Sequence, residues 1–264
     1  MRLRPQAGIE TMSIEDFSIG PSRGNRYDVT EGRVDISRAS RLAPVPFDLM
    51  AEPVNLTLDL AATALVIIDM QKDFCAAGGM VDERGGNYEK LRRPIEPLNK
   101  LIGWLRPRQV PIVWVNWGNR PDRRNLAPSI LYTFNRTGKR GIGASLQSRD
   151  SNILEKGSWS VEIVDELDKQ PDDIYVDKYR VSGFWDTPLD SILRQAGLTT
   201  LLFAGVNADQ CVFATMQDAA CIGYDTILLK DCVETGSPDY CMQATLYNAK
   251  VMGFVSDTAA FLNG

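Results

Sequence analysis

The chain has 264 residues, 44% of them hydrophobic and 24% charged, which is the composition of an ordinary globular protein with one large core. Its net charge of -5 argues against nucleic acid or an anionic membrane as the main partner, and no apolar run approaches the roughly 18 residues of a membrane span. The chain has no histidine, which excludes Ser-His-Asp and Cys-His catalysis as well as histidine metal ligands.

Residues 1–57 carry Gly, Pro, Ser and charges of both signs without a sustained period. They predict an N-terminal arm with at most short elements, followed by one domain over residues 58–264. Phe47, Leu49 and Met50 are candidates for fastening the end of the arm to the body or to a neighbouring subunit, and a disordered tail is the alternative. The basic start at residues 1–5 precedes no hydrophobic segment, so we do not expect a secretory signal.

From residue 61 the pattern alternates between apolar strands and helical segments. The predicted strands are 64–68, 111–115, 173–176, 201–205, 226–229 and 254–256, and the predicted helices are 95–105, 161–167, 187–197, 212–223 and 237–252. This alternation predicts an α/β fold, a doubly wound and mainly parallel six-stranded sheet with helices on both faces, in a Rossmann-like three-layer arrangement. Residues 118–157 form a long polar connection, which is typical of a lid or a subunit contact.

Three of the predicted strands end in a reactive side chain, Asp69, Lys178 or Cys211. The carboxyl ends of parallel strands share one edge, where open α/β sheets bind ligands, so the three can converge. Cys211 stands at the first turn of a predicted helix, where a thiolate is favoured, and we interpret it as a nucleophile rather than a small hydrophobic residue. Asp69 is expected to be poorly solvated, with a raised pKa suited to a proton acceptor. For Asp69 and Lys178 a structural ion pair is the alternative.

The five cysteines are an odd number and include no C-x-x-C pair. This usage favours free thiols in a reducing cytoplasm over a disulfide framework or a zinc site. We therefore expect a cytoplasmic protein without metal or other cofactor.

Three motifs resemble the isochorismatase-like cysteine hydrolases, and the resemblance runs from about residue 53 to the C-terminus. They are residues 68–74 (IDMQKDF), Lys178 after its strand, and residues 205–211 (GVNADQC). The resemblance implies a catalytic trio of Asp69, Lys178 and Cys211. It also implies a cis bond before Asn207 and an oxyanion hole formed by the backbone N–H groups of Asn207 and Cys211.

Within this family the chain is most similar to ureidoacrylate amidohydrolases. The similarity rests on residues 156–159 (KGSW), 164–167 (VDEL) and 182–194 (SGFWDTPLDSILR). Residues 116–122 (NWGNRPD) instead resemble biuret and N-carbamoylsarcosine amidohydrolases, which carry an arginine at the position of Asn116. Nicotinamidase-type relatives bind metal through Asp and His, a site that a chain without histidine lacks.

The resemblance implies a metal-independent amidohydrolase that cleaves a C–N bond of a small ureido or N-carbamoyl amide through a covalent Cys211 intermediate. Phe74 and Asn116 are the candidate substrate contacts. The alternatives are a biuret-type or other small-amide hydrolase, a vinyl-ether hydrolase like isochorismatase itself, and a non-catalytic assembly module. We further expect a homo-oligomer, a tetramer or dimer, with the arm or the 118–157 connection at the contact.

Overall fold

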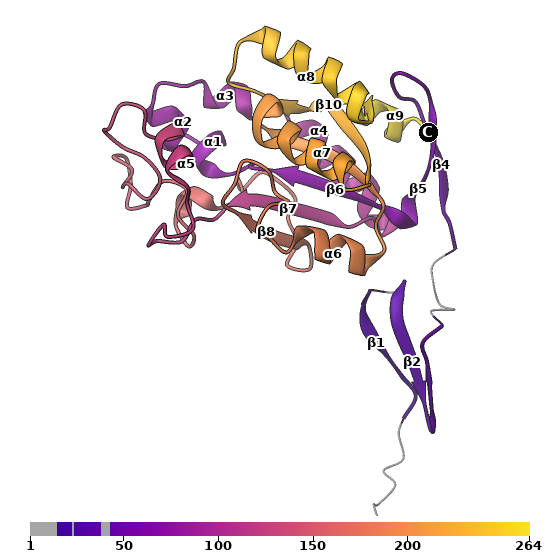
Figure 1. Ribbon diagram of the computed structural model, residues 1–264. Coiled ribbons are helices and arrows are strands. Elements are labelled where there is room, and N and C mark those ends of the chain that lie inside the picture. Colours follow the sequence, from indigo (N-terminus) through magenta and orange to yellow (C-terminus); the bar gives the residue numbers. More distant parts are fainter. Residues whose placement is uncertain (1–14, 23, 38–42) are drawn as a thin grey trace, which may run out of the picture.

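The computed structural model describes residues 15–22, 24–37 and 43–264, and contains one six-stranded parallel sheet (Figure 1). The strand order is β11-β10-β9-β6-β7-β8. Its strands are β6 (Thr63–Ile68), β7 (Ile112–Trp117), β8 (Ile174–Lys178), β9 (Thr200–Val206), β10 (Asp225–Glu234) and β11 (Phe254–Ser256). The predicted fold class is confirmed, and each of the six predicted strands is present.

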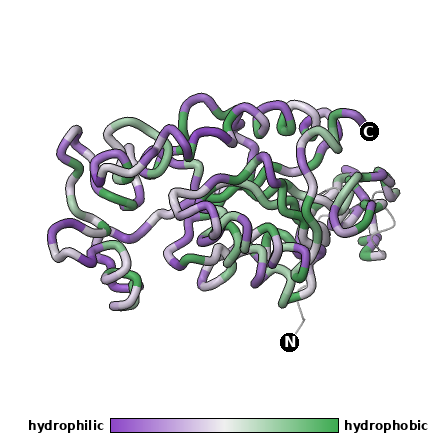
Figure 2. The backbone as a smooth tube through the Cα atoms, turned by 90° about the horizontal axis from the view of Figure 1, so that it is seen from above, coloured by the Kyte–Doolittle hydropathy of each residue, from purple (hydrophilic) through white to green (hydrophobic). Residues whose placement is uncertain are grey.

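The core lies around the central strands, because every residue of β6, β7 and β9 is buried. Figure 2 shows the same concentration of hydrophobic segments in the middle of the molecule. On one face α4 (Ile95–Leu105) packs with α9 (Thr258–Leu262), and on the other α7 (Phe213–Cys221) packs with α8 (Asp239–Met252). The remaining helices are α1 (Lys72–Cys75), α2 (Met80–Glu83), α3 (Tyr88–Leu91), α5 (Pro128–Thr133) and α6 (Leu189–Ala196). Within the described ranges no helix is both long and apolar enough to cross a bilayer.

One predicted helix is absent. Residues 161–167 contain only the end of a 3₁₀ turn, Trp159–Val161, and continue as irregular chain. Two of their backbone groups bond to residues at the start of α1 and just before it: the Lys72 N–H donates to the Glu162 carbonyl, and the Val164 N–H donates to the Met70 carbonyl. The amphipathic pattern correctly predicted which side of this segment is buried. It wrongly predicted a helix, because residues 70–72, which follow β6, form backbone hydrogen bonds with it.

The arm contains two small antiparallel sheets in its described part. Strands β1 (Phe17–Ser22), β2 (Asn25–Thr30) and β3 (Arg33–Asp35) form one, and β4 (Pro46–Leu49) pairs with β5 (Leu56–Asp59) in the other. Phe47 stacks on Phe261 and meets Trp104 edge to face, and Leu49 is buried, so both fasten the arm to the body as expected. Met50 is 61% exposed, so it contributes through its backbone, whose carbonyl accepts from the Ser256 hydroxyl at 2.7 Å. Residues 1–14, 23 and 38–42 of the predicted arm lie outside the described residues.

Gly205 lets β9 approach β6 directly beneath the carboxyl edge of the sheet. It has φ +110°, and a Cβ atom there would lie 2.0 Å from the Ile68 carbonyl oxygen. Gly205→Ala should therefore lower the free energy of unfolding by about 3 kcal/mol or more, because both the backbone conformation and the contact are unfavourable for alanine. Urea unfolding monitored by circular dichroism measures the change.

Gly103→Ala is the matched control, because Gly103 lies within α4 and a Cβ atom there meets open space. The same substitution should stabilise the protein by about 0.5–1 kcal/mol. Equal effects of the two substitutions would contradict the close approach of β9 to β6.

Candidate active site

The three predicted reactive side chains come together at the carboxyl edge of the sheet. Asp69 directly follows β6, Lys178 is the last residue of β8, and Cys211 lies in the turn after β9. The Lys178 Nζ atom is 3.1 Å from the Asp69 carboxylate and 3.3 Å from the Cys211 Sγ atom. Asp69 and Lys178 are fully buried and Cys211 is 6% exposed, so the structure forms one enclosed acid–base–thiol cluster.

Lys178 is held in place by more than its two ionisable neighbours. Its ammonium group donates to the carbonyls of Arg180 and Val181, at 3.1 and 3.3 Å, and lies 3.8 Å from the centre of the Trp117 ring. These contacts satisfy a buried cation and aim it at the space between Asp69 and Cys211.

Asp69 is oriented by its backbone and by β7. It has φ +55°, its N–H donates to the Val115 carbonyl, and its Oδ1 atom accepts from the Trp117 N–H at 3.2 Å. Burial raises the pKa of Asp69, and the Lys178 ammonium and the Cys211 thiol oppose that rise only in part. The sequence-based expectation of a raised pKa therefore agrees with the geometry.

The electrostatics of Cys211 differ from the prediction. Burial, followed by the charge of Asp69, raises the pKa of the Cys211 thiol to about 12, despite Lys178. The expected helix start is a π-type turn, Ala208–Val212, that leads into α7. The resting cysteine is therefore a thiol that donates to Asp69, because a second buried negative charge would have only one lysine to balance it.

The turn around Asn207 has the cis bond that the family resemblance implies, between Val206 and Asn207. The Asn207 carbonyl accepts from the N–H groups of Gln210 and Val212, at 3.0 and 3.2 Å. The Asn207 side chain is tied to the chain after β10, where its Oδ1 atom accepts from the Gly236 N–H at 2.8 Å. Both predicted oxyanion-hole residues thus belong to one fastened turn.

The two predicted substrate contacts lie near this edge but outside the polar cluster. Phe74 is buried in α1, and Asn116 is buried near the end of β7, paired in register with Asp177. The Asn116 Oδ1 atom is buried and has no hydrogen-bond partner among the described residues. A buried amide oxygen without a partner is costly, which suits a group that a substrate completes.

Two residues of the site were not assigned from the sequence. Trp117 supplies the N–H that donates to Asp69 and the ring that contacts Lys178. Gln71 holds the Trp117 backbone from both sides, donating to its carbonyl and accepting from its N–H at 2.8 Å each. Gln71 lies in the 68–74 motif, two residues after Asp69, and that position was the available signal.

Asp73, in the same motif, fastens the 118–157 connection to the site. Its carboxylate accepts from the Met80 N–H at 3.0 Å and from the Leu154 N–H at 2.6 Å. Burial raises the pKa of Asp73 to about 6. Both of its oxygens are thus engaged with backbone donors, which gives it an anchoring position rather than a place in the thiol cluster.

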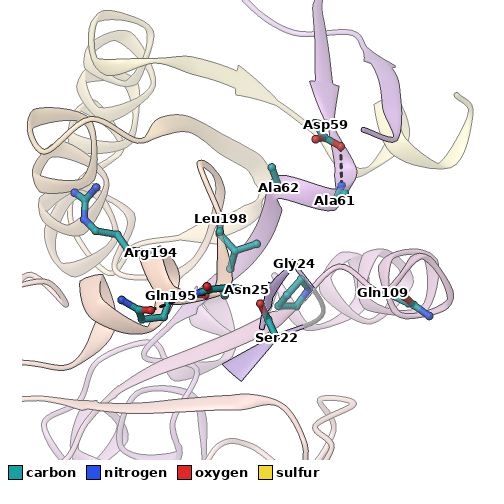
Figure 3. A pocket seen from close by; sticks show the side chains of 13 residues that line it. Ser22, Gly24, Asn25, Asp59, Ala61, Ala62, Gln109, Arg194, Gln195 and Leu198 are labelled. Atoms are coloured by element: carbon teal, nitrogen blue, oxygen red, sulfur yellow. Dashed lines mark hydrogen bonds between the residues drawn. The ribbon is translucent and has the colours of Figure 1, made fainter. Parts of the chain in front are cut away.

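A cavity of about 550 Å³ lies at the opposite edge of the sheet, between the arm and α6 (Figure 3). The Asn25 side chain reaches across it and donates to Gln195 at both the carbonyl and Oε1, and Asp59 accepts from the Ala61 N–H. Its lining includes the Ser22 hydroxyl, which is buried without a hydrogen-bond partner among the described residues, but none of the predicted site residues. The cavity is therefore separate from the enclosed cluster at the carboxyl edge.

The described part of the chain contains no group of three or more His, Cys, Asp or Glu side chains arranged to hold a metal ion. In the Asp69–Lys178–Cys211 cluster a lysine ammonium occupies the position between Asp69 and Cys211 that a cation would need. The donor set of this cluster therefore does not fit a bound metal.

Residues 63–260 match the isochorismatase domain. A cysteine hydrolase from Pseudomonas syringae pv. phaseolicola is similar in structure, with a TM-score of 0.66 and 25% identity over 78% of this chain and 93% of the other. The N-carbamoylsarcosine amidase from Thermoplasma acidophilum has a TM-score of 0.55 and 27% identity over 74% of this chain and 96% of its own. An isochorismatase-like hydrolase from Alkaliphilus metalliredigens has a TM-score of 0.59 and 25% identity, covering 77% and 98% of the two chains.

Proposed function

This chain belongs to the isochorismatase family of cysteine hydrolases, which act on non-peptide C–N bonds, and we propose that it hydrolyses a small linear ureido or N-carbamoyl amide such as ureidoacrylate. The observation that supports this most directly is the buried Asp69–Lys178–Cys211 cluster, with Lys178 Nζ 3.1 Å from Asp69 and 3.3 Å from Cys211. Because the five cysteines are free, we assign the reaction to the reducing cytoplasm.

In the proposed mechanism the Cys211 thiol transfers its proton to Asp69 as the sulfur attacks the substrate carbonyl carbon. Lys178 then balances the single negative charge at every stage, whether that charge lies on the carboxylate, the sulfur or the tetrahedral oxygen. The N–H groups of Asn207 and Cys211 bind that oxygen, and each such donor is typically worth about a hundredfold or more in rate.

Collapse of the tetrahedral intermediate breaks the C–N bond, and Asp69 returns the proton to the leaving nitrogen. An acyl or carbamoyl group remains on Cys211 as a thioester or thiocarbamate. Asp69 next takes a proton from water, whose oxygen attacks the same carbon, and the sulfur leaves and regains a proton. The cycle consumes one water and restores the resting thiol.

One unpaired polar group supports the choice of a ureido substrate. The Oδ1 atom of Asn116 is buried without a hydrogen-bond partner among the described residues. It is an acceptor, and β7 carries it to the carboxyl edge of the sheet. A ureido group has N–H donors on both sides of its carbonyl, so one of them can pair with Asn116 while the carbonyl oxygen occupies the oxyanion hole. A simple primary amide has N–H donors on one side only.

Ammonia release from a panel of ureido, carbamoyl and simple primary amides tests the proposal. We expect turnover of at least one ureido or N-carbamoyl compound, and loss of that activity after alkylation with iodoacetamide in a Cys221→Ala background, which removes the exposed thiol. A vinyl-ether hydrolase or a binding module would release no ammonia, and either result would overturn the proposed function.

Chelation is the control for metal independence. The rate should be unchanged after prolonged treatment with a chelator and dialysis, because the cluster uses a lysine where other hydrolases place a cation. Loss of activity that one divalent ion restores would contradict the cysteine mechanism as written.

The pH profile reports on Asp69. Its carboxyl must be ionised to accept the thiol proton, and its pKa is raised above the ordinary 3.8. A raised pKa keeps Asp69 protonated up to a higher pH. We therefore expect kcat/KM to fall on acidification, with a midpoint above pH 3.8. Stopped assays across pH 3.5–8 in constant ionic strength measure the midpoint. An acidic midpoint at or below pH 3.8 would contradict a buried Asp69 as the proton acceptor.

A further inference from the structure

Helix α8 is apolar on two opposite sides. Thr245 and Ala249 are buried against the body, and α8 packs on α7, β10 and β11. The side turned away from them carries the outer stripe: Tyr240, Ala244, Tyr247 and Val251. The three larger members of the stripe are 69%, 69% and 67% exposed, and Figure 1 shows α8 along the outer edge of the molecule with nothing above it.

The spacing within the outer stripe is four, three and four residues, which is the heptad spacing of helices that pair side by side. It places the stripe on one narrow line along the 14-residue helix. An exposed helix face is ordinarily polar, so an apolar line opposite the core indicates a second packing surface.

We propose that α8 pairs antiparallel with α8 of a second copy of this chain, along the outer stripe. The stripe reads the same from either end, so a two-fold axis between Ala244 and Tyr247 brings every member against another member. Tyr247 then lies against Ala244 of the second copy, and Tyr240 lies against Val251. Each tyrosine thus meets a smaller residue, which is the size match that close helix packing requires.

The flanks of the stripe fit the same pairing. Gln243 and Lys250 border it on one side, and Cys241 and Asn248 border it on the other. In an antiparallel pair Gln243 faces Lys250 of the second copy and Cys241 faces Asn248, so no like charges meet across the axis. The Lys250 ammonium is also balanced within its own chain by Glu52 at 3.0 Å.

A second copy fits this surface better than a different partner does, because the match is between the stripe and itself. This assignment differs from the sequence-based expectation, which placed the subunit contact at the arm or at the 118–157 connection. The stripe and the 118–157 connection each carry an exposed tyrosine, so the two surfaces can be compared directly. Tyr132 of the connection is 65% exposed, nearly as much as Tyr247 of the stripe.

Sedimentation between 1 and 100 µM tests the pairing. The wild-type mass should be a multiple of 29.3 kDa. Tyr247→Glu should raise the dissociation constant of the pair by about 100-fold or more, because the two-fold axis places the new charge in the interface twice. Tyr132→Glu, the same substitution at a matched exposure, should leave the wild-type mass unchanged.

A wild-type mass of 29.3 kDa throughout would overturn the proposal, as would an oligomer that Tyr247→Glu leaves intact. The stripe contains no residue of the proposed catalytic cluster, so the Tyr247→Glu variant should keep its turnover per site, and ammonia release also shows that it is folded. Failure of the pairing and failure of the proposed function therefore give separate results.

Cysteine cross-linking tests the antiparallel direction in a second way. In a Cys221→Ser, Cys241→Ser background, Ala244→Cys protein mixed with Tyr247→Cys protein should form a mixed disulfide under mild oxidation, because these positions face each other. Each variant alone should cross-link at most one-tenth as fast. Equal cross-linking of the single variants and the mixture would overturn the antiparallel arrangement.

Discussion

Cys211→Ala should reduce kcat by about 10⁴-fold or more on any substrate that the wild-type enzyme turns over, because the covalent route requires the sulfur. The thiol is buried, and in the proposed mechanism Asp69 accepts its proton and Lys178 balances its charge. Alanine leaves the ion pair of those two residues intact and removes only one atom from a tight turn, so the fold should persist. Ammonia release measures turnover, and circular dichroism verifies the fold.

The other four cysteines are the controls for this experiment. Cys75 and Cys232 are buried and make no hydrogen bond to Asp69 or Lys178, Cys221 is exposed, and Cys241 is partly exposed. Their alanine variants should each keep kcat within a few fold of the wild type, although Cys75→Ala and Cys232→Ala will lose some stability through small cavities. Wild-type turnover by Cys211→Ala would refute the proposed mechanism.

The second large effect is discrimination between substrate classes. A ureido or N-carbamoyl compound should exceed nicotinamide and plain aliphatic amides in kcat/KM by up to about 10⁴-fold, because a simple amide leaves a buried polar group of the site unpaired. That group is the Asn116 Oδ1 atom, which is buried without a partner among the described residues. Initial rates with matched concentrations of each class give the ratio directly.

Asn116→Ala provides the internal control for this discrimination. It should lower kcat/KM for the ureido substrate far more than for a simple amide, since only the ureido group pairs with the Asn116 side chain. Equal kcat/KM for both classes, or faster turnover of nicotinamide, would refute the substrate assignment and leave the cysteine mechanism untouched.

The parallel sheet and the meeting of its reactive side chains were predictable because both follow from patterns along the chain. Uninterrupted apolar runs such as residues 64–68 are typical of strands buried on both faces, and parallel strands end at a common edge. The positions of Asp69, Lys178 and Cys211 at three such ends therefore predicted their convergence. The distances of 3.1 and 3.3 Å were beyond the sequence, because they depend on how far each strand extends.

The sequence by itself determined which side chains reach the catalytic edge, and the tertiary structure decided their protonation and their supports. Position at a helix start predicted a Cys211 thiolate, but burial beside Asp69 raises the pKa of the thiol to about 12, and burial is set by the whole fold. Trp117 and Gln71 became part of the site only where β7 passes Asp69. Residues 161–167 had a helical pattern, yet their hydrogen bonds go to residues 70–72, some 90 positions earlier. The hydrophobic periodicity of a segment indicates which of its faces is buried. Distant parts of the chain supply the partner that buries that face.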